Sequence, residues 1–265
     1  MSKIAFIGAG KMGEAILKEL LRVGWADGGD IVLSDIDRGR LDKLAGEYGA
    51  RVAESNPAAA REAEIVLLAV KPQKMEEVLR EISGAVTPRQ TVISIAMGKS
   101  TEFIEALLPE KVPVVRVMPN NPAMVGAAVS VLSYGRHAGE DARRKAMDIF
   151  SSLGEVYELE EHLQDAAMAL SGCGPAYFYL LAEALSDAGV KLGLDRALAL
   201  KLAPGTMIGA GMMLRDSGHH PAYLKDMVTS PGGSTIAALE ALEEAGMRNA
   251  FYKAVTAAWR RAKEV

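Results

Sequence analysis

The stretch Ile4-Ala-Phe-Ile-Gly-Ala-Gly-Lys-Met-Gly13 decides the fold. Four apolar residues run into three glycines spaced Gly-x-Gly-x-x-Gly, and residues 16–21 then carry apolar side chains at helical spacing. This pattern predicts a strand, a tight turn and a helix. The first glycine permits the turn, the second lets the backbone approach a pyrophosphate, and the third lets the helix pack on the strand. Because free amides at a helix N-terminus attract phosphate, the stretch predicts a dinucleotide site. The alternative is a glycine-rich turn without a ligand.

The composition is that of an ordinary globular protein, with 49% hydrophobic and 24% charged residues among 265. A net charge of −4 gives no general attraction to nucleic acid or to an anionic membrane, so we expect neither as a partner. No apolar run is expected to reach transmembrane length, and the N-terminus leads directly into a strand without a signal segment. The only cysteine is Cys173, and four histidines make a metal site improbable. We therefore expect a cytoplasmic protein without a metal.

Apolar runs and helical patterns alternate along the first 160 residues. The runs expected to be strands cover residues 30–33, 65–70, 91–95 and 114–117, and edge strands are expected at 129–132 and 155–158. Helical patterns cover residues 39–48, 75–82, 101–108 and 141–153. The continuous apolar run at 65–70 is typical of a strand buried on both faces. This alternation predicts an α/β fold, an N-terminal Rossmann-type doubly wound parallel sheet.

The pattern changes near residue 160, after which every segment is predicted to be helical. The helices are expected at residues 162–170, 176–189, 195–217, 222–228, 234–245 and 247–263. Pro204 is expected to kink or divide the long third helix. These helices carry more apolar surface than about 105 residues can cover alone, which predicts an interface with a second copy. We therefore assign residues 1–160 to a dinucleotide-binding domain and 161–265 to an all-helical domain for substrate binding and dimerisation.

The second strand ends at Ser34-Asp35, where an acid in such folds accepts hydrogen bonds from the adenosine ribose. An acid there repels a 2′-phosphate and favours NAD over NADP, whereas Arg38 and Arg40 lie close enough in sequence to bind that phosphate. The alternative is that Asp35 or Asp37 only caps the following helix. After the strand at 65–70, Lys71 either lies beside the nicotinamide or the substrate or is a surface lysine.

The stretch Leu224-Lys-Asp-Met-Val-Thr-Ser-Pro-Gly-Gly-Ser-Thr235 joins the end of a short helix to the start of another. Small residues, hydroxyls and free amides at a helix start form a good pocket for a carboxylate. The competing explanation, which residue types alone favour, is a plain helix cap made by Ser230 or Ser234.

The sequence shows neither a serine, histidine and acid triad nor a metal cluster. Hydride transfer is compatible with the lack of such groups, because the cofactor carries the reactive atom and the protein mainly positions the cofactor. A carbonyl acceptor needs a strong acid nearby, whereas an imine that arrives protonated needs only orientation and one hydrogen bond. A hydroxyl such as that of Thr235 meets the second requirement.

The sequence resembles the Δ1-pyrroline-5-carboxylate reductase family over essentially its whole length. The resemblance rests on residues 6–13, on Ala69-Val-Lys-Pro72, on Ser171-Gly-Cys-Gly-Pro-Ala-Tyr177 and, most specifically, on residues 224–235. It implies reduction of L-1-pyrroline-5-carboxylate to L-proline with NAD(P)H, the last step of proline biosynthesis. It also implies homodimers joined through interlocked C-terminal helices, which in this family often form a pentamer of dimers.

The resemblance also implies roles for particular residues. The substrate carboxylate would be held by Ser230, Gly233, Ser234 and Thr235, and Thr235 would also hydrogen-bond the ring nitrogen as the catalytic residue. The cofactor would contact Ile7, Gly8, Ala9, Gly10, Lys11, Met12, Asn56, Ala69, Val70, Lys71, Pro72, Ile95, Ala96 and Met97, in addition to Ser34 and Asp35.

The chain departs from the family pattern at the second strand. Many members carry small hydroxyl residues or Asn-Arg there, suited to NADPH, whereas this chain has Ser34-Asp-Ile-Asp-Arg38. NADH is therefore a credible cofactor beside the NADPH that the resemblance implies. Thr229 occupies a position where members of the family often carry a cysteine, and Gly218 occupies one where some members carry a glutamate.

Two other functions compete with this one. A β-hydroxyacid dehydrogenase would use a lysine on a long helix with an asparagine four residues later, but Lys201 is followed by Gly205 at that position. A nucleotide-sensing module would bind the cofactor without oxidising it.

Overall fold

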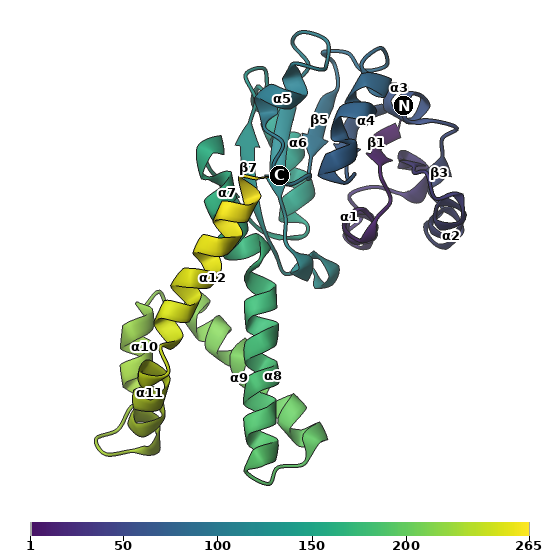
Figure 1. Cartoon of the computed structure of the whole chain (residues 1–265). Coiled ribbons are helices and arrows are strands. Elements are labelled where there is room, and N and C mark those ends of the chain that lie inside the picture. Colours follow the sequence, from purple (N-terminus) through teal and green to yellow (C-terminus); the bar gives the residue numbers. More distant parts are fainter. Residues whose placement is uncertain (1, 265) are drawn as a thin grey trace. The chain divides into compact units, whose positions relative to one another are not determined.

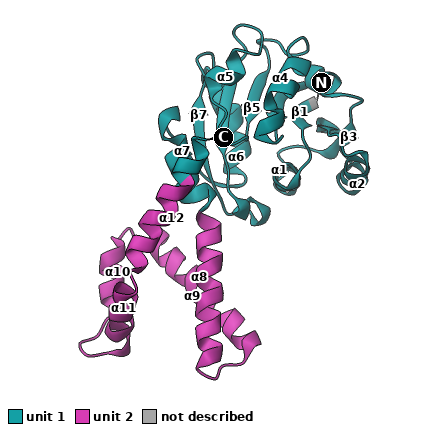
Figure 2. Ribbon diagram, viewed as in Figure 1, with its two compact units in different colours: residues 1–173, 259–265 teal, residues 174–258 magenta. Residues whose placement is uncertain are grey.

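The computed structural model describes residues 2–264 of the chain. They fall into two compact units, one made of residues 1–173 and 259–265 and the other of residues 174–258 (Figure 2). The first unit contains the sheet, and the second is helical. The domain boundary expected after residue 160 stays a prediction, because compactness does not show which residues fold independently.

One eight-stranded sheet forms the first unit, in the order β3-β2-β1-β4-β5-β6-β7-β8. The strands are β1 (Ser2–Ile7), β2 (Ile31–Ser34), β3 (Arg51–Val52), β4 (Ala63–Leu68), β5 (Thr91–Ser94), β6 (Val114–Met118), β7 (Ala128–Tyr134) and β8 (Gly154–Glu158). The strand order reverses between β1 and β4, which lie side by side in parallel with Phe6 opposite Leu67. The predicted doubly wound Rossmann-type fold is confirmed.

Helices cover both faces of this sheet (Figure 1). The helices of the first unit are α1 (Lys11–Arg22), α2 (Arg38–Tyr48), α3 (Asn56–Arg61), α4 (Met75–Ile82), α5 (Thr101–Glu105), α6 (Glu140–Ser151) and α7 (Gln164–Ala167). Alternate residues of one strand serve the two faces. Phe6 joins a core with α1, α2 and α6, whereas Ile7 joins a core with α4 and α5. Burial on both faces is the reason why these strands read as continuous apolar runs.

The sequence did not predict every element of this unit. The strand β3 has only two residues and α3 only six, so neither carries enough periodicity to be recognised. The predicted edge strands exist, but β7 runs antiparallel to β6, and β8 then pairs parallel with β7. The sheet is therefore parallel at every described pairing except β6 with β7.

The segment after β8 is not the single helix expected at residues 162–170. It forms a 3-10 turn (Glu161–Leu163), the short helix α7 and a π-helical turn (Met168–Gly172). Buried Arg116 of β6 binds this segment through two ion pairs, at 3.3 Å to Glu161 and 3.1 Å to Asp165. These tertiary contacts explain a break that helical propensity alone does not predict.

The second unit consists of helices α8 (Gly174–Lys191), α9 (Arg196–Asp216), α10 (Pro221–Met227), α11 (Ser234–Glu244) and most of α12 (Met247–Ala262). Pro204 lies inside α9 without dividing it, so the expected division is wrong. Only Gly174, Ser186 and Ala199 are buried among residues 174–258. The remaining apolar side chains are at least partly open to solvent, so this unit lacks a core of its own.

By length and composition, α9 is apolar enough to cross a membrane. The expectation that no apolar run reaches transmembrane length is therefore wrong when length and composition are the criteria. The reason is that α9 contains many apolar residues and small residues but few charged ones. A helix that packs against a second copy of the chain has the same composition. The exposed apolar surface is shared by α8, α9 and α10, which favours the interface predicted from the sequence.

We predict that Ile208→Lys weakens self-association. Ile208 lies on α9 with 65% of its surface exposed, and burying a lysine in an apolar interface is costly. The dissociation constant of the dimer should rise about a hundredfold or more, as measured by analytical ultracentrifugation.

Val23→Lys is the matched control, because Val23 is 43% exposed at the end of α1 in the first unit. A dimer equally stable in both variants would contradict the helical interface.

Candidate active site

The carboxyl ends of β1, β2, β4 and β5 form one continuous edge. Backbone hydrogen bonds extend the sheet beyond the strands, from Gly8 N to Ser34 O at 2.8 Å, from Ala69 N to Ile7 O at 2.8 Å and from Ile95 N to Leu68 O at 3.1 Å. This edge includes the position between β1 and β4 where the strand order reverses. Ligands of open α/β sheets bind in the crevice at that position.

Glycine is required at the three positions of the first turn for different reasons. Gly8 has φ +95°, and a Cβ there would lie 2.6 Å from the carbonyl oxygen of Ala69. A Cβ on Gly13 would lie 2.8 Å from the carbonyl oxygen of Gly8. Gly10 is different, because it is exposed and a Cβ there would meet nothing within 4 Å. The protein's own packing explains Gly8 and Gly13, whereas Gly10 fits the close approach of a ligand.

Ala9, in the middle of this turn, is held through both of its backbone polar groups. Its amide donates to Asp35 Oδ2 at 2.6 Å, and its carbonyl oxygen accepts from Arg40 Nε. Arg40 Nη2 in turn lies 2.6 Å from Glu14 Oε2 on α1. The start of α2 thus fixes the glycine turn from one side.

Asp35 is not the cap of α2, because Asp37 caps it by accepting from Arg40 N at 3.0 Å. The Asp35 carboxylate instead uses one oxygen for Ala9 N and the other for Asp37 N, at 2.9 Å. Each oxygen keeps a second lone pair that can accept a ribose hydroxyl. The capping alternative for Asp35 is therefore wrong, and its ribose role stays a prediction.

Two further predicted cofactor residues are joined directly. The Ser34 hydroxyl donates to Asn56 Oδ1 at 2.7 Å, and Asn56 Nδ2 donates to Glu81 Oε2 at 2.7 Å. This pair links the end of β2 to the first turn of α3. The side chain of Asn56 is thereby oriented at the same edge of the sheet.

The structure places all the predicted cofactor residues along this edge or at the first turn of the helix that follows. Ile7 ends β1, Gly8, Ala9 and Gly10 form the turn, and Lys11 and Met12 begin α1. Ala69, Val70, Lys71 and Pro72 follow β4, and Ile95, Ala96 and Met97 follow β5. The side chain of Lys71 is exposed, so both of its predicted placements remain open.

The predicted substrate residues lie together in the second unit, at the start of α11. Ser230, Pro231, Gly232 and Gly233 form a tight turn in which Gly233 N donates to Ser230 O at 3.1 Å. Gly232 has φ +67°, and proline followed by such a glycine is typical of a type II turn. A Cβ on Gly233 would collide with the Ser230 hydroxyl. Ser230, Gly233, Ser234 and Thr235 are thus brought into one turn.

The start of α11 carries no side-chain cap. Gly233 is the N-cap residue and makes no side-chain cap, and no other side chain of residues 2–264 is seen to accept from the first amides of the helix. The hydroxyls of Ser230, Ser234 and Thr235 donate to no group of residues 2–264. The plain cap by Ser230 or Ser234 is therefore wrong, and free amides beside three hydroxyls suit a carboxylate.

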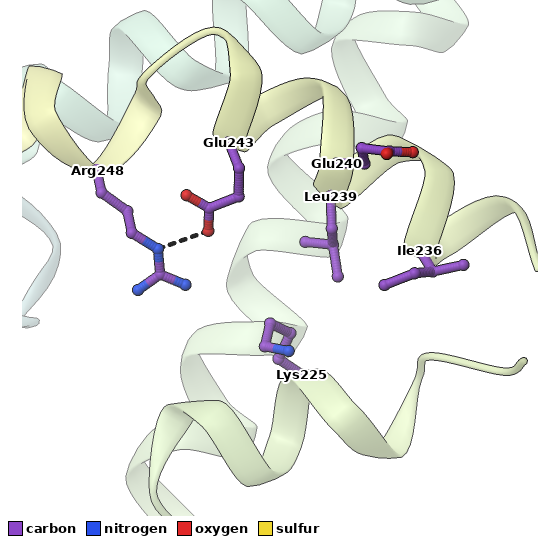
Figure 3. Close-up of a pocket in the computed structure, with 6 residues that line it drawn as sticks. All are labelled: Lys225, Ile236, Leu239, Glu240, Glu243 and Arg248. Carbon is purple, nitrogen blue, oxygen red and sulfur yellow. Dashed lines mark hydrogen bonds and ion pairs between the residues drawn. The ribbon is translucent and has the colours of Figure 1, made fainter.

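A separate pocket of about 350 Å³ lies between α10, α11 and the start of α12 (Figure 3). Its two cations are already paired, Arg248 with Glu243 and Lys225 with Asp226, each at 2.6 Å. None of the four predicted substrate residues lines it. We therefore do not assign the substrate to this pocket.

Two tyrosines of the first unit are unsuited to proton transfer at neutral pH. Burial, together with neighbouring Glu47, raises the pKa of Tyr48 to about 12. Burial and a hydrogen bond to Glu158 also raise the pKa of Tyr134. General acids work best with a pKa near the working pH. No group of three His, Cys, Asp or Glu side chains able to hold a metal occurs in residues 2–264.

Sequence reasoning missed two residues of this region. Glu14 is found only through its ion pair with Arg40, which joins residues 26 positions apart. Asn120 is buried after β6, where its side chain accepts from Val129 N at 2.9 Å and donates to Ser171 O at 3.1 Å. The only indication of Asn120 in the sequence was its place in the stretch Met118-Pro-Asn-Asn-Pro122, directly after a predicted strand. The spacing of the polar residues in this stretch does not predict which groups they bind.

Family models match both parts of the chain. The model described as pyrroline-5-carboxylate reductase dimerisation matches residues 161–265. The model described as NADP oxidoreductase, coenzyme F420-dependent, matches residues 3–98.

Relatives match the chain over nearly its whole length. A pyrroline-5-carboxylate reductase of Methanosarcina acetivorans is 43% identical over 99% of this chain and 97% of its own. That of Synechocystis is 42% identical over 99% of this chain and 98% of its own. Among solved structures, the Coxiella burnetii reductase is 36% identical with a TM-score of 0.91, over 99% of this chain and 98% of its own. The Plasmodium falciparum reductase with NADP bound is 32% identical with a TM-score of 0.89, over 99% and 97%.

We predict that Gly10→Ala weakens cofactor binding without loss of stability. The added methyl meets no protein atom, but it occupies the space through which the backbone approaches a pyrophosphate. The dissociation constant for NAD(P)H, from fluorescence titration, should rise about tenfold or more, and the melting temperature should stay unchanged.

Gly8→Ala is the comparison, because φ +95° and the Ala69 carbonyl oxygen leave no room for a methyl group. It should lower the melting temperature by several degrees even without cofactor. Equal stability losses in both variants would argue against a ligand at Gly10.

Proposed function

The chain belongs to the pyrroline-5-carboxylate reductase family, and we propose that it reduces L-1-pyrroline-5-carboxylate to L-proline with NAD(P)H, as the last step of proline biosynthesis. The reaction consumes one NAD(P)H and one proton. The hydride adds to the imine carbon of the protonated ring, and the former C=N π electrons remain on nitrogen as the lone pair of the secondary amine. The chain is thus an oxidoreductase that acts on a carbon–nitrogen bond.

The cofactor supplies the hydride, and the residues of the sheet edge supply its binding. Gly10 would leave room for the pyrophosphate, and the first amides of α1, at the positive end of the helix, would bind it. Asp35 would accept hydrogen bonds from the ribose, and Asn56, held by Ser34, would contribute to the same edge. The loops after β4 and β5, residues 69–72 and 95–97, would contact the cofactor farther along the edge.

The turn before α11 holds the substrate. The free amides at the helix start and the hydroxyls of Ser230 and Ser234 bind the carboxylate, which the positive end of the helix also favours. The Thr235 hydroxyl hydrogen-bonds the ring nitrogen and fixes the orientation of the imine. No residue needs to donate a proton to a developing alkoxide, because the ring enters already protonated.

The observation that carries this proposal is the start of α11, which has no side-chain cap and lies beside three hydroxyls without a partner in the described part of the chain. The direct test is the loss of absorbance of NADH and of NADPH, with and without pyrroline-5-carboxylate. We expect oxidation only when the cyclic imine is present. Cofactor binding without oxidation would support the nucleotide-sensing alternative.

The surroundings of Lys201 argue against the alternative function, that of a β-hydroxyacid dehydrogenase. It is exposed on α9, and Gly205 stands one turn later where that class requires asparagine. We therefore assign Lys201 no catalytic role.

The assembly and location also belong to the proposal. The exposed apolar helices and the dimerisation family model support a homodimer, which we propose assembles further into a pentamer of dimers. We place the enzyme in the cytoplasm, with neither nucleic acid nor membrane as a partner, in line with its modest negative charge.

We predict that Thr235→Ala lowers turnover by about ten- to a thousandfold, the range expected for one positioned hydrogen bond in the transition state. Steady-state kinetics with saturating cofactor measures it. Thr256→Ala, an exposed threonine of α12, is the control and should leave turnover unchanged. Equal kinetics in the two variants would remove Thr235 from the mechanism.

We also predict that Asp35→Ser shifts the cofactor preference towards NADPH. The change removes a charge that repels the 2′-phosphate and a ribose acceptor that favours NADH. The ratio of kcat/KM for NADPH to that for NADH should rise about tenfold or more. An unchanged ratio would mean that Asp35 serves only to hold the backbone amides of Ala9 and Asp37.

A further inference from the structure

We infer that Glu14 determines cofactor preference by holding Arg40 in an ion pair that keeps it from a nucleotide 2′-phosphate. This inference rests on the proposed nucleotide site. It adds Glu14 to that site. It also pairs Arg40 with a carboxylate, which the position of Arg40 in the sequence did not predict.

The ion pair is well formed and only partly open to solvent. Arg40 Nη2 lies 2.6 Å from Glu14 Oε2, and the two side chains are 30% and 31% exposed. Arg40 Nε donates to the carbonyl oxygen of Ala9, which fixes the guanidinium group at a second point. Two of its nitrogens are therefore committed within the protein.

This arrangement lies beside the acid expected to bind the ribose. Asp35 holds the amide of Ala9, while Arg40 holds the carbonyl oxygen of the same residue. The Asp35 carboxylate and the Arg40 guanidinium thus flank one residue of the glycine turn. A phosphate on the ribose 2′-oxygen, next to the position that Asp35 serves, comes within reach of that guanidinium.

The local charges decide what a 2′-phosphate meets there. The acids are Asp35, Asp37 and Glu14. The cations are Lys11, exposed in the first turn of α1, Arg38, exposed in the first turn of α2, and Arg40. Because Glu14 neutralises Arg40, the Arg40 guanidinium adds no net positive charge at the position of the phosphate. Without the Glu14 carboxylate, Arg40 keeps its anchor on Ala9 and can give its remaining donors to a phosphate in bidentate geometry.

The test compares two nucleotide fragments that differ only in the phosphate. The affinities of 2′,5′-ADP and 5′-AMP for the full-length chain are measured by calorimetry for wild type, Glu14→Gln and Glu14→Ala. We expect both substitutions to tighten 2′,5′-ADP binding about tenfold and to change 5′-AMP binding less than twofold. The gain should shrink at high salt, because the site is partly exposed.

Two further variants make the result specific. Asp42→Asn removes one charge from an exposed position of α2 and should leave both affinities unchanged. In an Arg40→Gln background, Glu14→Gln should give no gain, because the cation that it would release is absent.

The contradicting outcomes are distinct. A gain that persists without Arg40 would show that Glu14 acts only by repulsion, and weaker binding of both nucleotides would show that it only maintains the glycine turn. Either outcome overturns the inference. Neither fragment carries a nicotinamide, so the result does not depend on whether the chain reduces pyrroline-5-carboxylate.

Discussion

The close approach of Gly8 to the backbone after β4 is the contact on which the site depends. No side chain fits there, because a Cβ on Gly8 would lie 2.6 Å from the Ala69 carbonyl oxygen. The ends of β1 and β4 can therefore meet at the point where the strand order reverses. Once they meet, backbone hydrogen bonds bring Ser34 and Ile95 to the same edge, and α1 starts there with Gly10 as an N-cap residue that makes no side-chain cap. A steric requirement at one glycine thus organises the whole nucleotide half of the site.

The helical unit is stabilised differently, because its apolar residues are available for contacts with a second copy and do not form a core within the unit. Only three of residues 174–258 are buried, two of them glycine or alanine and the third Ser186. The apolar area left open is what a second copy covers in a homodimer, so folding and assembly of this unit are coupled. Within it, the turn of residues 230–233 leaves the start of α11 without a cap. Free backbone amides beside three hydroxyls at a helix start favour the binding of an anion.

The sequence predicted the parts of the structure that local chemistry determines. The glycine motif, the helix at residues 75–82 and the apolar central strands followed from spacing alone. The contacts between distant residues did not follow, since the Glu14–Arg40 pair and the anchoring of Ala9 exist only after the sheet has formed. Pro204 is another example, because it predicted a kink or a division, whereas the division does not occur and α9 continues from Arg196 to Asp216. The plain cap at Ser230 or Ser234 was favoured by residue types, and only the backbone of Gly233 showed that the helix starts without one.

The central claim is that a nicotinamide cofactor delivers a hydride directly to a protonated cyclic imine. Incubation of the chain with pyrroline-5-carboxylate and cofactor deuterated at the transferable C4 position tests this most directly, with mass spectrometry of the product. The account predicts proline with one deuterium on the ring carbon beside nitrogen that bears no carboxylate. Proline without deuterium from either face of the cofactor, or no proline at all, would contradict it.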